Sequence, residues 1–362
     1  MALLDSEGFG MSGTLSDYLS YGVLATRGTG VITGHQQIST GGPLGDNVID
    51  LYSAYFGGET PIYERIFNAA PTTFFFGCRT CFGPSGALSN GSGGFNFMDS
   101  AGVIQFSVQV DYLGNLAVYR GYAGDSLHGA GTSLGSASNV FAVDGSTYSY
   151  IEVGATIDGS TGSVVVKKNG STVLTISSAN TKNSSLANVG RVQFYTNNNT
   201  FQQKTTHIYF SDNSGSSPWN TYLGDVRVQT LLPTGDATVQ FSHTGLGSNH
   251  ANAANSPPVP GSDYNSDTVV GHQDTFDMAA ISSGLTTVFG LNVKVLYQKA
   301  DAGARLVQNV LVSSSTTATG TATGPGVTPS TIATMFETDP NTSAQWTQTN
   351  ANAATPGYKI NA

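Results

Sequence analysis

The sequence predicts an all-β protein, a jelly-roll β-sandwich followed by a smaller β-rich domain. Three observations predict it. Only 10% of the 362 residues are charged, against roughly 25% in ordinary globular proteins, so long exposed helices would lack their usual polar face. Short segments alternate apolar and polar residues with the period of a strand, and clusters of Gly, Asn and Ser separate them. The hydrophobic content of 39%, with 18 Phe and 16 Tyr, is enough for substantial cores.

The strand pattern becomes clear from residue 72. The apolar run from Thr73 to Cys78 is typical of a strand buried on both faces. Between 148 and 158 apolar and polar residues alternate, so Ile151 and Val153 share one face and Tyr150 and Glu152 the other. Asn-Gly at 169–170 is typical of a two-residue hairpin turn. The strands predicted in this part cover residues 72–78, 103–110, 116–119, 148–158, 163–168, 172–176, 191–195 and 207–211.

The segment 222–236, YLGDVRVQTLLPTGD, predicts the last strand of the sandwich and its end. Val226 and Val228 alternate with polar residues, as in a half-buried strand. Pro233 lacks the ladder donor and Gly235-Asp236 favours a turn, so the strand is predicted to stop there.

The predicted domains follow from this boundary. The first domain covers residues 1–236, with an N-terminal arm over about 1–45. Residues 237–268 are predicted as a connector because this segment is rich in Asn, Ala, Ser and Pro. The C-terminal domain covers 269–362 and contains strand-like runs at 275–278, 287–297 and 305–313.

Charge and hydropathy argue against two classes of partner. The formal net charge is −9, and no basic patch is present to neutralise phosphates, so we expect no nucleic-acid partner. No run of about 20 apolar residues is present, so we expect no membrane insertion. The first ten residues lack the basic and apolar regions of a secretory leader, which predicts synthesis and folding in a cytoplasm.

The distribution of carboxylates predicts a protein that is not an enzyme and has no catalytic residue. Glycosidases aim two acids at one bond, and strand geometry would supply them at i and i+2 or i+4. Glu152 and Asp158 are six residues apart, and Asp225 is alone on its predicted strand. The sequence contains no HExxH.

We expect no cofactor and no metal site. Cys78 and Cys81 form one CxxC, whereas a structural zinc site needs four ligands, so two thiols at a strand end are the preferred interpretation. Calcium remains an alternative at the Asp-rich loops that begin at Asp158 and Asp212. Turn formation explains these loops better, because Asp, Asn, Ser and Gly are turn-forming residues and a calcium site usually needs two or more carboxylates.

Five aromatic residues have polar neighbours and are candidates for contact with a glycan or with a neighbouring subunit: Tyr148, Tyr150, Tyr209, Trp219 and Tyr222. Aromatic rings stack on sugars and are also enriched at assembly interfaces. The sequence leaves both alternatives open.

Three segments resemble the concanavalin A-like (laminin-G-like) jelly-roll domain of a family of tailed-bacteriophage structural proteins. They are YIEVGATIDGSTGSVVVKKNGSTVLTIS (150–177), HIYFSDNSG (207–215) and YLGDVRVQTLLPTGD (222–236). The resemblance covers residues 100–236 well and the preceding part loosely. Fragments of the C-terminal part, such as FETDPNTSAQWT (336–347), resemble the domain that follows this jelly roll in phage proteins.

The resemblance implies a virion structural protein, associated with the tail, a tail fibre or the neck, or decorating the capsid. Other virion proteins would be its partners, it would form homo-oligomers, and it would be assembled into the virion in the host cytoplasm. The alternative is a lectin-like adhesin that binds host-surface glycan. A glycan-cleaving enzyme of the same fold is a third hypothesis, against which the carboxylate spacing argues.

Overall fold

The protein is described from a computed structural model. It describes residues 3–7, 25–26, 36–40, 42–43, 47–52, 62–67, 69–84, 91–122, 131–197, 201–245, 248–255, 263–283, 285, 287–300 and 303–361. The described residues fall into two compact units, of which the first ends at Val228 and the second continues from Gln229.

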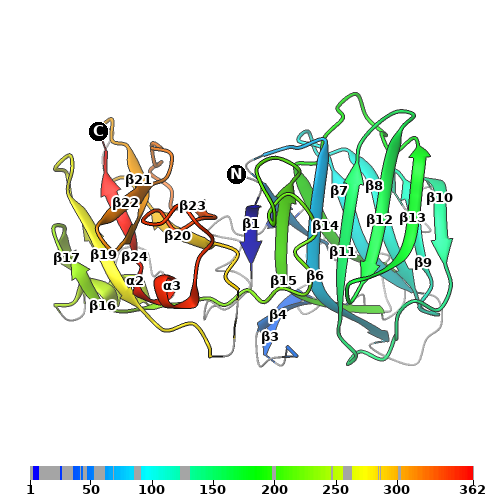
Figure 1. The fold of residues 1–362 in the computed structure, drawn as a ribbon, viewed down its shortest axis with the longest axis horizontal. Helices are drawn as coiled ribbons and strands as arrows, with labels where there is room; N and C mark the ends of the chain where they lie inside the picture. The colour runs from blue at the N-terminus through cyan, green and yellow to red at the C-terminus, as the bar shows by residue number, and fades with distance from the viewer. Residues whose placement is uncertain are drawn as a thin grey trace. The chain divides into compact units, whose positions relative to one another are not determined.

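The first unit is a sandwich of two antiparallel sheets (Figure 1). The front sheet has the strand order β13 (Ser171–Ala179), β12 (Gly162–Lys168), β11 (Ser149–Thr156), β6 (Thr73–Pro84), β15 (Phe201–Asp212), β4 (Asn47–Tyr52) and β3 (Gln36–Thr40), and β1 (Leu3–Glu7) also pairs with β15. The back sheet has the order β10 (Thr132–Ala137), β9 (Leu116–Arg120), β8 (Ile104–Asp111), β7 (Ser92–Met98), β14 (Arg191–Asn197), β5 (Ile62–Ile66) and β2 (Ala25–Thr26).

Aromatic residues fill the space between the two sheets. Phe76 of β6 lies 5.3 Å from Phe95 of β7 and 6.1 Å from Phe194 of β14, measured between ring centroids. Phe97 and Phe106, on neighbouring strands of the back sheet, stack at 4.7 Å. Because side chains alternate along a strand, the residues between these aromatics face outward. The outer faces of the two sheets are therefore the surfaces on which a site can be built.

A β-bulge in β15 changes which side chains face outward. Thr206 pairs with Arg79, but the next pair in register is Tyr209 with Gly77, so two residues of β15 lie opposite one of β6. His207, in this bulge, has a φ of +52°, which is uncommon outside glycine. The bulge places Tyr209 on the outer face of the front sheet and returns Phe210 to the core.

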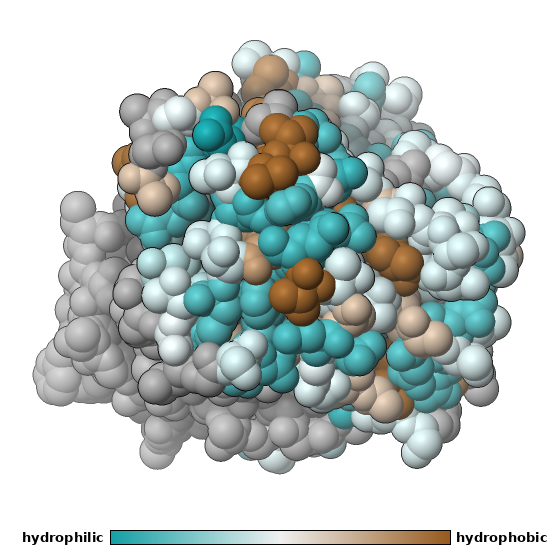
Figure 2. Space-filling model, turned by 90° about the vertical axis from the view of Figure 1, so that its left-hand side faces the viewer, coloured by the Kyte–Doolittle hydropathy of each residue, from teal (hydrophilic) through white to brown (hydrophobic). Residues whose placement is uncertain are grey.

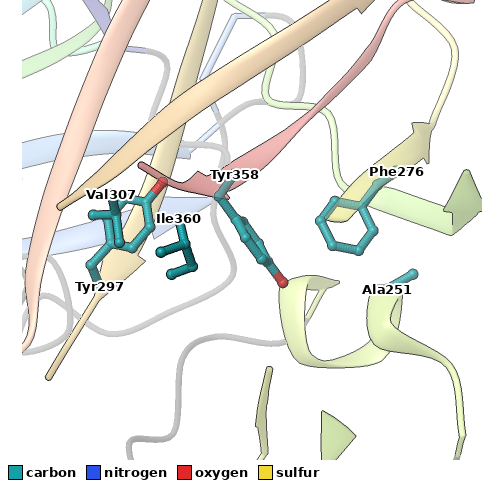
Figure 3. Close-up of a cluster of buried hydrophobic side chains, with 6 residues drawn as sticks. All are labelled: Ala251, Phe276, Tyr297, Val307, Tyr358 and Ile360. Carbon is teal, nitrogen blue, oxygen red and sulfur yellow. The ribbon is translucent and has the colours of Figure 1, made fainter. Parts of the chain in front are cut away.

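The second unit is built around a five-stranded sheet in the order β16 (Pro233–Thr238), β19 (Gln273–Met278), β24 (Thr355–Ile360), β21 (Val307–Ser313) and β22 (Thr316–Thr319). Its described residues also form two further strand pairs and two short helices: β20 (Leu291–Tyr297) with β23 (Ser330–Phe336), β17 (Ser242–Thr244) with β18 (Tyr264–Ser266), α2 (His250–Asn255) and α3 (Gln348–Ala353). One of its apolar clusters, drawn in Figure 3, comprises Ala251, Phe276, Tyr297, Val307, Tyr358 and Ile360.

The predicted fold class, a jelly-roll sandwich followed by a smaller β-rich domain, is confirmed. The predicted last strand of the sandwich is wrong, because residues 222–229 join no sheet and the chain turns at Gly224, whose φ is +82°. Pro233 begins β16 instead of ending a strand, which is a position where the missing donor is tolerated. The second unit therefore starts at Gln229 and not after Asp236, and much of the predicted connector 237–268 is ordered as β17, α2 and β18. No helix in the described ranges is long and apolar enough to cross a membrane.

Candidate functional site

The predicted aromatic contact residues gather at the outer face of the front sheet, where the segment 219–228 lies against β11, β6 and β15. Glu152 is 1% exposed in the centre of this face. Its Oε1 accepts a hydrogen bond from the Tyr209 hydroxyl at 2.7 Å and another from the Gly224 amide at 2.8 Å. The Leu223 amide donates to the Tyr209 hydroxyl at 3.2 Å. The segment is thus held to the sheet by backbone donors instead of by a strand ladder.

Two glycines make this packing possible. A Cβ on Gly77 would lie 2.1 Å from Cε1 of Tyr209, so the absence of a side chain lets the Tyr209 ring cross β6 and reach Glu152. A Cβ on Gly154 would lie 2.2 Å from the hydroxyl of Tyr222. Both side chains approach the sheet closely because these two positions on neighbouring strands carry no side chain.

Tyr222 packs between the sheet and a lysine. Its ring contacts Phe75 edge-on at 4.9 Å, and Nζ of Lys167 lies 3.8 Å from its centroid. Burial, followed by the nearby charge of Glu152, raises the pKa of Tyr222 to about 12. Beside it, Arg79 binds both carboxylate oxygens of Asp225. Asp225 therefore closes an ion pair and does not stand alone.

The remaining predicted contact residues are also enclosed. Tyr150 and Tyr209 are each 1% exposed and Trp219 is 6% exposed, and burial raises the pKa of Tyr150 and of Tyr209 well above the ordinary value. Tyr148 is half-buried. His207 and Tyr209 lie inside a twelve-residue strand and not near a loop tip. The five aromatics therefore pack the sandwich and its covering segment, and only Tyr148 and Tyr222 keep an accessible part.

The two cysteines face opposite sides of β6. Cys78 pairs with Ile151 of β11 and lies on the core side, whereas Cys81 is an odd number of residues away and lies on the outer side. Both are free and buried. Burial raises the pKa of Cys78 well above the ordinary value and that of Cys81 to about 11, which makes both thiols poor nucleophiles.

The outer face of the back sheet carries a row of polar side chains that the sequence did not reveal. Strand register places Glu64, Gln193, Asn96, Ser107 and Tyr119 side by side on β5, β14, β7, β8 and β9. We call these five residues the polar row. Their hydrogen bonds link neighbouring strands: the Asn96 amide donates to Gln193 Oε1 at 2.7 Å, and the Ser107 hydroxyl donates to Asn96 Oδ1 at 2.6 Å.

The polar row is buried except at its Tyr119 end. Glu64, Gln193, Asn96 and Ser107 are 0–5% exposed, whereas Tyr119 is half-buried. Ser133 of β10 pairs with Tyr119 and is exposed, so the row continues onto accessible surface. At its buried end Arg191 donates to Glu64 at 2.9 Å. All of these strands alternate inward and outward residues in the same way. The sequence alone therefore does not show which outward polar residues are neighbours across the sheet.

A parallel row lies next to it and ends in the same accessible region. Gln109 of β8 pairs with Ala117 of β9, and Ala117 pairs with the exposed Ser136 of β10. The Gln109 amide donates to the Ser92 hydroxyl at 2.9 Å. The half-buried Tyr122 lies 5.8 Å from the Tyr195 ring, measured between centroids. We call Gln109, Tyr119, Tyr122, Ser133 and Ser136 the back platform.

The Asp-rich turns use their carboxylates internally. Asp158 Oδ1 accepts the amides of Ser160 and Thr161 at 2.7 Å each, and these hydrogen bonds lower the pKa of Asp158 to about 2. Asp212 Oδ1 accepts the amide and the hydroxyl of Ser214. Both are Asx turns, in which the side chain replaces a backbone acceptor. In the described part of the chain no group of three or more His, Cys, Asp or Glu side chains is arranged to hold a metal.

A buried network in the second unit joins residues that are scattered in the sequence. His250 Nδ1 lies 2.7 Å from Asp274 Oδ2, and Asp274 Oδ1 accepts the amides of Gln240 and Phe241. Asn265 donates to the His250 carbonyl and to the Tyr358 hydroxyl. The network ties α2 and the β17–β18 strand pair to the central sheet, which is a structural use of these polar groups.

Comparison with known proteins gives likenesses at low identity. The chain resembles the solved structure of the alginate lyase Aly36B, with 14% identity, a TM-score of 0.42, and coverage of 59% of this chain and 98% of that chain. It also resembles the carbohydrate-binding module CBM66 from Bacillus subtilis (11% identity, TM-score 0.32, 53% and 97%) and the carbohydrate recognition domain of Emp46p (8%, 0.35, 57% and 94%). No family model matches the sequence, and no curated protein matches it.

Proposed function

We propose that the chain is a non-enzymatic structural protein of a tailed-phage virion, associated with the tail, a fibre or the neck, or decorating the capsid. It acts through contacts with its own copies and with other virion proteins. The family resemblance of residues 100–236 is the reason for proposing a virion protein. The hydrogen bonds that the carboxylates accept within the fold are the reason for proposing that it is not an enzyme.

One observation carries the non-enzymatic part of the proposal. Every carboxylate of the sandwich whose side chain is described accepts a hydrogen bond that holds the fold together. They are Asp50, Glu64, Asp99, Asp111, Asp144, Glu152, Asp158, Asp212 and Asp225. A glycosidase needs an acid and a second carboxylate that face the substrate, whereas these nine face turns, an arginine or neighbouring strands.

The surface suits a protein that is displayed in many copies. The face shown in Figure 2 is mostly hydrophilic, and its apolar side chains lie in separate spots. The exposed large apolar residues of the second unit are likewise spread over its loops and strand ends; they are Val239, Tyr264, Val269, Val270, Leu306 and Val327. Scattered apolar residues are normal on a soluble surface, so specific contacts would come from smaller mixed patches.

The test is to look for the protein in purified phage particles of its host. Mass spectrometry of gradient-purified particles is expected to detect it, and electron microscopy with a specific antibody fragment is expected to locate it on the particle. Absence from purified particles would rule the proposal out. Release of reducing sugar from host polysaccharide by the pure protein would rule out its non-enzymatic part.

A second candidate function is host-glycan recognition by the same virion protein, acting as an adhesin. The back platform favours it, because amides, hydroxyls and tyrosine rings are the groups that contact sugars. Binding of the purified protein to host cells, competed away by soluble host glycan, is the expected result. Binding to capsid or tail proteins alone would favour the first candidate.

A further inference from the structure

The geometry points to the back platform as a binding site for uncharged saccharide, with the adjoining polar row as its support. This inference rests on the adhesin form of the proposed function. It moves the glycan contact from the five aromatic residues of the front sheet to Gln109, Tyr119, Tyr122, Ser133 and Ser136 on the opposite sheet.

Accessibility is the first argument. The front-sheet residues Tyr150, Tyr209 and Trp219 are at most 6% exposed, and the segment 219–228 is hydrogen-bonded over that face. The back platform is more accessible to solvent, since Ser133 and Ser136 are exposed and its three larger residues are half-buried. A half-buried ring keeps one part in contact with the protein and leaves another part for a ligand.

The chemistry of the groups is the second argument. A saccharide presents hydroxyls that donate and accept, and apolar C–H faces. Gln109 offers an amide whose orientation is set, because its nitrogen donates to the Ser92 hydroxyl at 2.9 Å. Tyr119 and Tyr122 offer rings for the C–H faces, each with a hydroxyl at its edge. Ala117, between Gln109 and Ser136, is too small to cover them.

Preorganisation is the third argument. Tyr119 stands next to Ser107 on the neighbouring strand, and Ser107 is held by Asn96, which is held by Gln193. Buried polar side chains on an outer sheet face carry a desolvation cost unless they are paired. Here Ser107, Asn96 and Gln193 are linked by hydrogen bonds from one strand to the next. The side chains that adjoin the platform are therefore rigid, and little ordering is required when a ligand binds.

Charge selects an uncharged ligand. In the described strands of the back sheet, register places one basic side chain, Arg191, on the outer face. It already donates to Glu64 at 2.9 Å, at the buried end of the polar row. A uronate or sialate would need an available cation to offset its charge. The chain's net charge of −9 adds a general repulsion of acidic sugars.

The experiment uses the full chain and three neutral probes, cellotetraose, maltotetraose and chitotetraose, with tetragalacturonate as the acidic comparison. Binding is measured by calorimetry and by shifts of the Gln109 side-chain amide in NMR spectra. Saturable binding of at least one neutral probe is expected, and Tyr119→Ala and Gln109→Ala should each weaken it about tenfold. The matched control is Tyr112→Ala, because Tyr112 is exposed on the turn after β8, outside the back platform.

A blocking variant keeps the test valid where Tyr119→Ala fails to fold. Ser133 is exposed on an edge strand, so Ser133→Trp should fold and abolish binding by covering the platform, whereas Thr172→Trp on the edge strand of the front sheet should leave binding unchanged. No binding of any neutral probe, binding that survives Ser133→Trp, or binding of tetragalacturonate alone would each overturn the inference. Detection in phage particles without neutral-saccharide binding would rule out this site and leave the virion proposal standing. Neutral-saccharide binding by a protein that is absent from phage particles would leave the site standing and rule out the virion proposal.

Discussion

The hydroxyl of Tyr209 donates to Glu152 Oε1 at 2.7 Å across the bare backbone of Gly77. The two residues are on strands that flank β6, and they meet because the bulge in β15 turns Tyr209 outward and Gly77 leaves its path open. The pair is the anchor of the segment 219–228, since Gly224 donates to the same carboxylate oxygen.

Removing the Tyr209 hydroxyl should destabilise the sandwich. In Tyr209→Phe the buried Glu152 carboxylate loses one of its two donors, and a charged group left short of partners costs about 2 kcal/mol of unfolding free energy. Urea unfolding followed by fluorescence measures it. Tyr112→Phe, at an exposed position, should change the unfolding free energy by less than about 0.5 kcal/mol. Equal stability of both variants would show that the pair does not anchor the segment.

Gly77→Ala should disturb the same site by steric contact. The new methyl would lie 2.1 Å from Cε1 of Tyr209, so the ring must move away from Glu152, at a cost of about 1–3 kcal/mol. The near-UV circular dichroism of the tyrosines should change with it. Gly159→Ala is the control, because no atom lies within 4 Å of the added Cβ. An unchanged Gly77→Ala spectrum and stability would contradict the packing.

The two cysteines should be unreactive in the folded protein and should not form a disulfide with each other. They face opposite sides of β6, and burial raises the pKa of Cys81 to about 11 and that of Cys78 well above its ordinary value. At pH 8 Ellman's reagent should label neither thiol in native protein and both in denaturant. Fast labelling of native Cys81, or an intramolecular disulfide found by mass spectrometry, would contradict this arrangement.

Acid should weaken the turn that Asp158 closes. The turn amides lower its pKa from 3.8 to about 2, so the folded state binds the proton less readily than the unfolded state. The stabilisation is therefore present above about pH 4 and is lost as pH falls through about 2. NMR titration of the Asp158 carboxyl measures the pKa directly. Asp158→Asn keeps the turn acceptor, so it should remove this part of the pH dependence while the turn persists; a titration midpoint near 4 would refute it.

In the second unit, Asn309→Ala should be strongly destabilising. Its buried side chain accepts from Tyr297 at 2.7 Å and donates to the carbonyls of Val293 and Ile332, which joins β21 to the β20–β23 pair. Several buried groups lose partners at once, so we expect a loss of about 3 kcal/mol in unfolding free energy. Thermal unfolding of the full chain measures it. Asn361→Ala, whose side chain is exposed, should be near neutral, and a similar effect of both changes would exclude this role.

Local pattern was enough for the central strands of the front sheet. The alternation of Ile151 and Val153 with Tyr150 and Glu152 predicted β11 and its two faces, and Asn169-Gly170 predicted the hairpin between β12 and β13. Such features depend on neighbours a few residues apart, and period and turn chemistry are sufficient to predict them. The same reasoning failed at 222–229. A segment that packs on a sheet face without pairing can show the same alternation of apolar and polar residues as a strand that pairs at a sheet edge.

The sequence by itself determined the all-β class and the positions of strands such as β6, β11, β12 and β13. Tertiary structure alone decided which polar residues meet: Glu152 with Tyr209, His250 with Asp274, and Asn96 with both Gln193 and Ser107. The reason is physical. Strand order and the bulge at His207 set the register between distant segments, and a shift of one residue would turn a strand side chain such as Tyr209 or Asn96 to the other face.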